Sequence, residues 1–200
     1  MVSAYAFYRC SLAFSSLDLP LCVSIYSSAF WGCTGLQIAI LSACTSIYSA
    51  AFSGCTNLQS LIIPVCKSIA LSGISNCTYL SYVYGTGLTI ATTVFRYRYS
   101  LRTIILGSAC SYIGQSAFGS CRNLLSVYLL GSNVCKLSAA NAFAGTPISN
   151  STASTGGVHG SVFVPASLYA TYIASTNWVN YSARLVSLTD AEIAQILIYG

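Results

Sequence analysis

Residues 50–58 read AAFSGCTNL, and this phrase returns along the chain with small changes. The clearest other copies are SAFWGCTGL ending at Leu36, SGISNCTYL ending at Leu80 and SAFGSCRNL ending at Leu124. The aromatic position recurs at steps of 21 to 25 residues, at Phe7, Phe30, Phe52, Ile74, Phe95, Phe118 and Phe143. A fixed period in the twenties indicates a solenoid, in which each repeat buries its apolar face only against its neighbours.

An apolar pattern follows each copy of the phrase and predicts a strand. Apolar residues recur three and five positions after the leucine of the phrase, as in Leu58, Leu61 and Ile63. Because residues two apart in an extended segment point to one face, both later residues face the core. The pattern L-x-x-L-x-L at this period is typical of leucine-rich repeats. We therefore expect an α/β-type solenoid, a leucine-rich repeat right-handed superhelix with a parallel concave β-sheet. Most of it should be strand and irregular structure, with a small α+β cap at the C-terminal end.

The composition argues against a membrane span, although 55% of the residues are hydrophobic and only 6% are charged. Crossing a bilayer needs about 20 consecutive, mostly apolar residues. The uncharged segment 19–66 contains fourteen Ser, Thr, Asn or Gln residues as well as Pro20 and Pro64. We therefore expect no membrane span in this chain.

Charged residues are too few and too scattered for several kinds of chemistry. Asp18, Asp190 and Glu192 are the only carboxylates, which argues against paired-carboxylate hydrolysis and oxygen-ligated metal sites. The net charge of +5 comes from eight Lys and Arg residues spread along the chain, whereas nucleic-acid binding requires a basic stripe. The single histidine, His159, has no neighbouring carboxylate in the sequence to orient it as a catalytic base. We expect no enzymatic activity, no nucleic-acid partner and no cofactor.

The ten cysteines fall into two columns of the repeat, one following the aromatic position by three residues and one on the opposite half of the turn. The columns are Cys10, Cys33, Cys55, Cys77 and Cys121, and Cys22, Cys44, Cys66, Cys110 and Cys135. The chain has no CxxC pair, so a zinc site is not expected. Cysteines of neighbouring turns would lie about 4.8 Å apart, but their parallel Cβ vectors do not suit a disulfide dihedral near 90°. We favour reduced thiols in the core over disulfides.

The phrase A-F-x-G-C-x-x-L, followed by a strand and a further isoleucine, closely resembles the BspA-type leucine-rich repeats. These repeats occur in surface proteins of human-associated bacteria and in some parasitic protozoa. The resemblance covers residues 3–148, and GSVFVPASLYATYIASTNWVNYSARLVSL is similar to the usual continuation in such bacterial proteins. It implies a non-enzymatic binding or adhesion module of a bacterial cell-surface or secreted protein. The alternative is a spacer or stalk that displays another domain and has no ligand of its own.

Between the core positions of each strand, two residues must point onto the concave face. The later position reads Asp18, Ile40, Ile62, Tyr84, Ile105 and Tyr128 along the chain. Apolar residues that are exposed singly need no functional explanation, whereas a continuous row of them indicates a binding surface. Solenoids also bind partners on their concave surfaces. The preference of β-branched and aromatic residues for strands explains the row equally well. We predict a protein- or glycan-binding surface, the concave strip, formed by Ile40, Ile62, Tyr82, Tyr84, Ile105 and Tyr128.

FRYRYSLR, residues 95–102, is the one basic and aromatic cluster. Arg96, Arg98 and Arg102 could stack on sugars or bases and pair with phosphate or carboxylate, which makes them a secondary candidate patch. The alternative is a degenerate repeat with solvated arginines, because arginine stems extend readily along a surface to reach water. Arg98 occupies a position of the cysteine column, so we expect its turn to bulge outward.

Three segments follow from these patterns. Residues 1–148 form six repeats and a partial seventh with an uncapped N-terminal end, residues 149–160 a Gly/Ser/Thr-rich connection, and residues 161–200 a cap. In the cap we expect a strand, a short helix, a final strand and a helix over 190–198 that begins with a Thr189–Glu192 capping box. Trp178 and Tyr181 would cover the open core of the last repeat. We expect the chain to be monomeric or joined to upstream sequence, and the resemblance implies an extracellular or cell-surface location.

Overall fold

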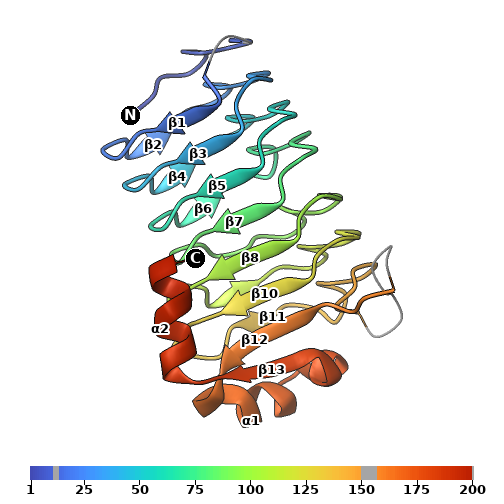
Figure 1. The fold of residues 1–200 in the computed structure, drawn as a ribbon. Coiled ribbons are helices and arrows are strands. Elements are labelled where there is room, and N and C mark those ends of the chain that lie inside the picture. Colours follow the sequence, from blue (N-terminus) through green and yellow to red (C-terminus); the bar gives the residue numbers. More distant parts are fainter. Residues whose placement is uncertain (11–13, 150–156, 200) are drawn as a thin grey trace.

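The computed structural model describes residues 1–10, 14–149 and 157–199. These residues form a parallel β-solenoid of about eight turns, stacked in chain order (Figure 1). Its main sheet lies in the order β1, β3, β5, β7, β8, β10, β12 and β13. These strands span Ser16–Asp18, Ile38–Ile40, Ser60–Ile62, Tyr82–Tyr84, Thr103–Leu106, Ser126–Leu129, Ser161–Pro165 and Leu185–Leu188.

Shorter strands form two further sheets on the other half of the turns. One contains β2 (Ser24–Ile25), β4 (Ser46–Ile47) and β6 (Ser68–Ile69), and the other pairs β9 (Tyr112–Ile113) with β11 (Lys136–Leu137). The helical elements all lie near the C-terminal end: α1 (Ala166–Ala174), the 3-10 helix η1 (Trp178–Arg184) and α2 (Asp190–Tyr199). The expected connection over 149–160 falls largely on residues 150–156, outside the described residues.

The register of the main sheet aligns equivalent positions of successive repeats. Leu61 of β5 lies opposite Ala39 of β3 on one side and Val83 of β7 on the other, and all three are buried. The predicted leucine-rich solenoid with a parallel concave sheet is therefore confirmed.

The repeated phrase forms the loop that precedes each main-sheet strand. Gly32 and Gly54 have φ angles of 70° and 75°, in the left-handed region where glycine carries no steric cost. Their amides donate hydrogen bonds of 2.8 Å to the carbonyls of Ser53 and Ser75 in the next turn. The backbone amides and carbonyls of these loops therefore find partners in the neighbouring turn, so the loops can be packed together without water as a partner.

The aromatic column stacks through the core in two runs. Phe30 stacks on Phe52 with ring centroids 5.2 Å apart, and Phe118 stacks on Phe143 at the same distance. Ile74 takes the aromatic position between the two runs and is fully buried. Ring stacking adds to the free energy gained by burying each side chain, and it fixes the spacing of neighbouring turns.

The cysteine columns donate hydrogen bonds as well as fill volume. In the first column, Cys55 Sγ donates to the carbonyl of Phe30 at 3.1 Å and Cys77 Sγ to that of Phe52 at 3.1 Å, so each thiol reaches the preceding turn. In the second column, Cys44 Sγ donates to the carbonyl of Ser46 at 3.4 Å. All ten cysteines are free thiols in the structure, and nine of them are buried. A small side chain that also donates to a buried carbonyl explains why cysteine recurs here.

We expect the stability of the protein to fall as the pH rises above about 9. Burial raises the pKa of Cys77 and of Cys121 to about 12, against the smaller lowering by the Arg98 guanidinium and backbone hydrogen bonds. In the unfolded chain these thiols ionise near pH 8.5, so their stabilising effect is complete below that pH and is lost as the pH rises towards 12. Each thiol lowers the free energy of unfolding by up to about 1.4 kcal/mol per pH unit in this window.

Urea unfolding with a reductant at about pH 8, 9 and 10 measures this slope. Cys121→Ala lowers stability at every pH, but it should also flatten the dependence, because alanine does not ionise. Cys77, and at higher pH Tyr172 and Tyr181, whose pKa values burial also raises, leave a residual slope of the same sign. A slope identical in the wild type and the variant would contradict the assignment to this thiol.

Side chains of the C-terminal segment take the place of the backbone of a further turn. The amide of Cys135 donates to the Tyr172 hydroxyl at 2.9 Å, and the indole nitrogen of Trp178 donates to the carbonyl of Cys135 at 2.6 Å. Asn177 Nδ2 donates to the carbonyl of Leu137 at 2.9 Å. The edge of the last repeat is therefore paired by side chains rather than left open.

The prediction that Trp178 and Tyr181 cover the core of the last repeat is confirmed. Both are buried, with exposed fractions of 0% and 3%. The Tyr181 ring meets Phe143 edge-on with centroids 5.3 Å apart, so it ends the second aromatic stack.

The predicted C-terminal helix is confirmed as α2, but it does not cap the end of the solenoid. Its capping box is complete: the Thr189 amide donates to Glu192 Oε2 at 2.8 Å, and the Glu192 amide donates to Thr189 Oγ1 at 3.3 Å. These hydrogen bonds lower the pKa of the exposed Glu192 carboxyl. From the end of β13, α2 turns back and runs beside β12, β10 and β8 (Figure 1).

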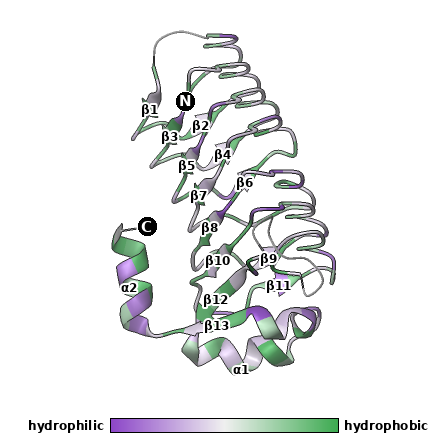
Figure 2. Ribbon diagram, turned by 45° about the vertical axis from the view of Figure 1, so that its right-hand side comes forward, coloured by the Kyte–Doolittle hydropathy of each residue, from purple (hydrophilic) through white to green (hydrophobic). Residues whose placement is uncertain are grey.

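Figure 2 shows α2 on the open side of the main sheet, with both hydrophilic and hydrophobic residues along it. Neither α2 nor any other helix in the described ranges combines the length and the apolar character needed to cross a membrane.

Candidate functional site on the concave face

The strand register brings the concave strip together on one face. Ile62 pairs with Ile40 on one side and Tyr84 on the other, and Ile105 pairs with Tyr84 and Tyr128 in the same way. Tyr82 lies in the neighbouring row, between Ser60 and Thr103. The sequence therefore predicted correctly which residues share this face.

The N-terminal half of the strip is open. Ile38 is 38% exposed, and Ile40 and Ile62 are half-buried against their neighbours in the sheet. No helix crosses this half in Figure 1. Ile38 and Ile40 on β3 and Ile62 on the neighbouring β5 form an apolar patch, and Asp18 of β1 lies opposite Ile40 at its edge.

The C-terminal half of the strip is covered, which the sequence did not predict. Ile105 is only 3% exposed, although it occupies the same column as Ile40 and Ile62. It forms a small apolar cluster with Leu130 and Leu188. Packed against this cluster are Tyr82, Tyr84, Tyr128, Phe163, Ile193 and Ile196. The expectation that Ile105 lies open on the surface is therefore wrong, because the segment containing Leu188 and α2 folds back over it.

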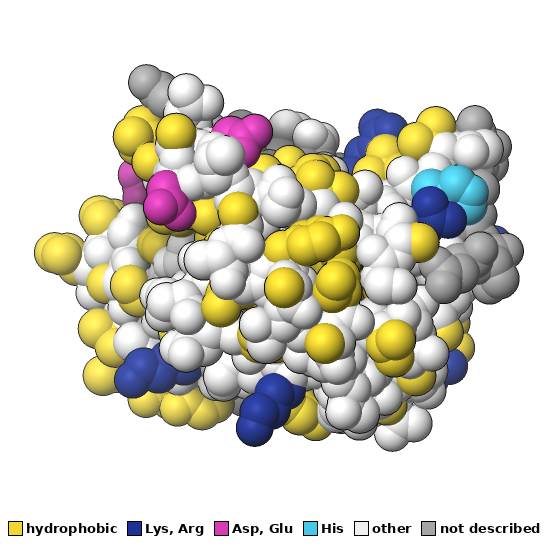
Figure 3. All heavy atoms as spheres, turned by 90° about the horizontal axis from the view of Figure 1, so that it is seen from below, with side chains coloured by type: hydrophobic (Ala, Val, Ile, Leu, Met, Phe, Trp, Pro, Cys, Tyr) yellow, Lys and Arg dark blue, Asp and Glu magenta, His cyan; other side chains and the backbone are white. Residues whose placement is uncertain are grey.

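Figure 3 shows the molecule from its C-terminal end, with the concave side edge-on. Acidic side chains and the histidine stand on two opposite ridges at this end, with a dip between them. The ridge with the histidine is held by a contact of 2.9 Å between Arg184 Nη2 and His159 Nδ1. Between these ridges the concave face is a trough, and the apolar cluster around Ile105 forms its floor near this end.

Phe163 belongs to the same row, and the sequence analysis missed it. It lies opposite Tyr128, and the two rings stack with centroids 4.5 Å apart. The signal was present in the chain, because SVYL at residues 126–129 and SVFV at residues 161–164 are nearly the same strand. The expected cap therefore contributes a strand to the concave sheet.

The Tyr82 hydroxyl is buried on this face and makes no hydrogen bond to any described residue. Burial raises the pKa of Tyr82, with a further contribution from Tyr84. A buried donor without a partner is uncommon in folded proteins.

The secondary candidate patch does not form one surface. Arg96 lies over the ring of Tyr97, 4.6 Å from its centroid, and is exposed. Arg102 lines a shallow polar depression of about 400 Å³ with Gln59 and Tyr79. Arg98 lies half-buried beside the buried thiols of the cysteine column. The three arginines therefore point into different surroundings.

The expected bulge at Arg98 is wrong. Its amide donates to the carbonyl of Phe95 at 3.1 Å, as the amide of Cys33 does to Phe30 in a regular turn. Arg98 Nε is buried without a hydrogen bond to the described part of the chain, and burial lowers the pKa of the guanidinium. The loop keeps its shape because the amides of Phe95 and Tyr97 donate hydrogen bonds to the carbonyls of Ala117 and Gly119 in the next turn, so the side chain adapts instead.

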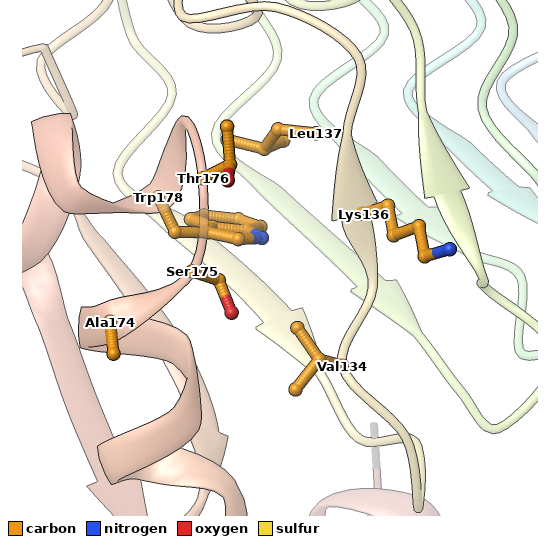
Figure 4. Close-up of a pocket in the computed structure, with 7 residues that line it drawn as sticks. All are labelled: Val134, Lys136, Leu137, Ala174, Ser175, Thr176 and Trp178. Carbon is orange, nitrogen blue, oxygen red and sulfur yellow. The ribbon is translucent and has the colours of Figure 1, made fainter.

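A second hollow lies where β11 meets the segment between α1 and η1 (Figure 4). It has a volume of about 430 Å³, and Lys136, Thr176 and Trp178 are among its lining residues. Trp178 closes the solenoid core by its hydrogen bond to Cys135, so this wall of the hollow serves the fold.

Metal binding and catalysis find no support in the described ranges. No three His, Cys, Asp or Glu side chains there are close enough together to hold a metal ion. His159 contacts an arginine rather than a carboxylate.

The model of the BspA type Leucine rich repeat region (6 copies) matches residues 1–124 and 88–159. The chain belongs to this family. The matched residues include every turn from the N-terminus to the end of the repeats, and so the whole concave strip. No curated protein matches the chain.

Among solved structures, this BspA type protein is similar to the leucine-rich repeat protein of T. pallidum. The two share 28% identity with a TM-score of 0.50, over 57% of this chain and 58% of the other. The chain thus spans a little more than half the length of that relative. The likeness supports the leucine-rich repeat fold.

Proposed function

We propose that this BspA type chain is a non-enzymatic binding or adhesion module of a bacterial cell-surface or secreted protein. Its partner binds through the open half of the concave strip. One observation carries the proposal: Ile38 and Ile40 of β3 and Ile62 of β5 form an apolar patch that no helix of the described chain covers. Monomeric proteins rarely expose a contiguous apolar surface without a binding role.

The chemistry of this patch favours a protein over a glycan. Binding sites for sugars need polar groups that replace the hydrogen bonds of water, and aliphatic side chains offer none. Aliphatic and tyrosine side chains are typical of the buried centre of protein interfaces. The family supports the location, because BspA type repeats are typically associated with bacterial surfaces.

We expect the double substitution Ile40→Asp and Ile62→Asp to weaken partner binding by about 30-fold or more, since it places two unpaired charges at the centre of an apolar interface. Surface plasmon resonance of the immobilised chain against a panel of purified extracellular-matrix proteins and glycans first identifies a binder. The affinity of each variant for that binder is then measured.

Val65→Asp with Leu71→Asp is the matched control. Both residues are exposed, at 45% and 63%, and lie in the same region of the solenoid outside the main sheet. The control should bind as the wild type does. If the control loses binding and the concave variant retains it, the concave face is not the binding surface. A chain that binds none of the panel would favour the spacer function.

A further inference from the structure

The helix α2 occupies part of the concave face as a ligand would. Ile193 and Ile196 are one helical turn apart and pack against the cluster that contains Ile105. Residues three apart on a helix lie on the same face, so both isoleucines can enter the trough together. Their contacts account for the difference in exposure between Ile105 and the open Ile40 and Ile62.

The attachment of α2 to the rest of the fold is slight. Its capping hydrogen bonds run between Thr189 and Glu192, inside its own first turn. Whereas α1 packs closely against β12, β13 and η1, α2 makes few close backbone approaches to any described element. Leu197 and Ile198 remain 44% and 70% exposed. A helix that packs on the concave cluster through Ile193 and Ile196 can leave its site without disturbing the solenoid core, of which it is not a part.

We propose that the concave face is a groove for an aliphatic helix. In the free protein α2 fills the C-terminal half of this groove, and a helical segment of a partner, with Ile or Leu one turn apart, takes its place. This inference rests on the proposed function, because it assumes that the concave face is the binding face.

Two further features fit a helical occupant. The trough floor is a row of Ile and Tyr side chains that runs across the strands, beyond the end of α2 and into the open half (Figure 1). A longer helix in the position of α2 would therefore cover the whole row. The buried Tyr82 hydroxyl lacks a partner while α2 is in place, so a longer or more polar helix can satisfy it.

The test uses a peptide with the sequence of α2 as the probe. A fluorescein-labelled peptide of residues 189–199 is titrated against the full chain carrying Ile193→Asp and Ile196→Asp. The two aspartates should detach α2 from the groove of its own chain. The peptide should therefore bind the variant at least about tenfold more tightly than the wild type, in which α2 fills the groove. Ile198→Asp, on the exposed part of the same helix, is the matched control and should behave as the wild type does.

Three results would overturn the proposal. The first is equal peptide affinity for the wild type and the double variant, and the second is equal binding of a peptide that itself carries both aspartates. The third is concentration-dependent dimerisation of the wild type with exchange of α2, seen by light scattering, which would make a second copy the occupant.

Hydrogen exchange keeps the proposal testable if the double variant folds poorly. In the wild type, the amides of α2 should exchange about tenfold or more faster than those of α1, because opening of α2 need not unfold the core. Equal protection of the two helices would show that α2 is a fixed part of the fold. The peptide and hydrogen-exchange experiments need no external partner. A negative result in them can therefore be told apart from a negative result of the Ile40 and Ile62 substitutions, which tests the proposed function.

Discussion

Replacing Trp178 with alanine should lower the free energy of unfolding by about 5 kcal/mol. Most of this loss comes from a large cavity, because Trp178 is fully buried and packs against Phe143 and Tyr172 at the open end of the core. The rest comes from the carbonyl of Cys135, which loses its hydrogen bond from the indole nitrogen and stays buried. In a solenoid each turn is stabilised by its neighbours, so the last turns should lose more of their local stability than the first turns do.

Urea unfolding measures the total effect, and hydrogen exchange of β10 and β12 tests where it acts. Trp178→Phe keeps most of the volume but removes the donor and one ring of the indole, so it should cost about 2 to 3 kcal/mol. Val179→Ala changes the next residue, which is 57% exposed, and should stay within about 0.5 kcal/mol of the wild type. A loss spread evenly over all turns would argue against a local capping role.

The substitution Gly114→Ala should cost about 3 kcal/mol or more, although it adds a single methyl group. A Cβ at this position would lie 2.4 Å from the backbone nitrogen of Thr92 and 2.7 Å from the carbonyl carbon of Ala91. Backbone of the preceding turn cannot move aside as a side chain could, so the two turns would have to separate. Their separation would also strain the hydrogen bond from the Gly114 amide to the carbonyl of Ile90.

Gly131→Ala is the matched control, because it makes the same change where the nearest atoms lie at ordinary contact distances of 3.4 Å or more. We expect its free energy of unfolding to differ by less than about 1 kcal/mol from the wild type. Thermal or urea unfolding of both variants gives the comparison, and similar losses in the two would refute the steric argument.

The sequence predicted which residues share the concave face, but it did not predict which of them are exposed. Each strand alternates between core and surface, so the spacing from Leu58 or Leu124 was enough to place Ile62 and Tyr128 on one face. The burial of Ile105 depends on where α2 folds back, and no local pattern encodes that position. Ile193 and Ile196 read in sequence as the apolar face of a short helix, without an indication of what they cover.

Similarly, the sequence showed that Arg98 departs from the cysteine column, but it did not show how the loop would accommodate the arginine. Whether the loop bulges or the side chain adapts depends on the relative cost of breaking turn-to-turn hydrogen bonds and of burying a guanidinium. The structure keeps the loop and leaves Arg98 Nε buried without a partner among the described residues.

The sequence by itself determined the solenoid, the parallel sheet and the columns of cysteine and phenylalanine through the repeated phrase AAFSGCTNL, and the helix start at Thr189 through a capping box. The repeat features depend on contacts within a repeat or with its neighbour, which a period near 22 residues specifies, and the capping box depends on residues three apart. The tertiary structure alone decided that α2 fills half of the concave strip and that Gly114 tolerates no side chain. These features arise where the chain leaves its period or where distant segments meet, and there the free energy depends on packing that no single repeat contains.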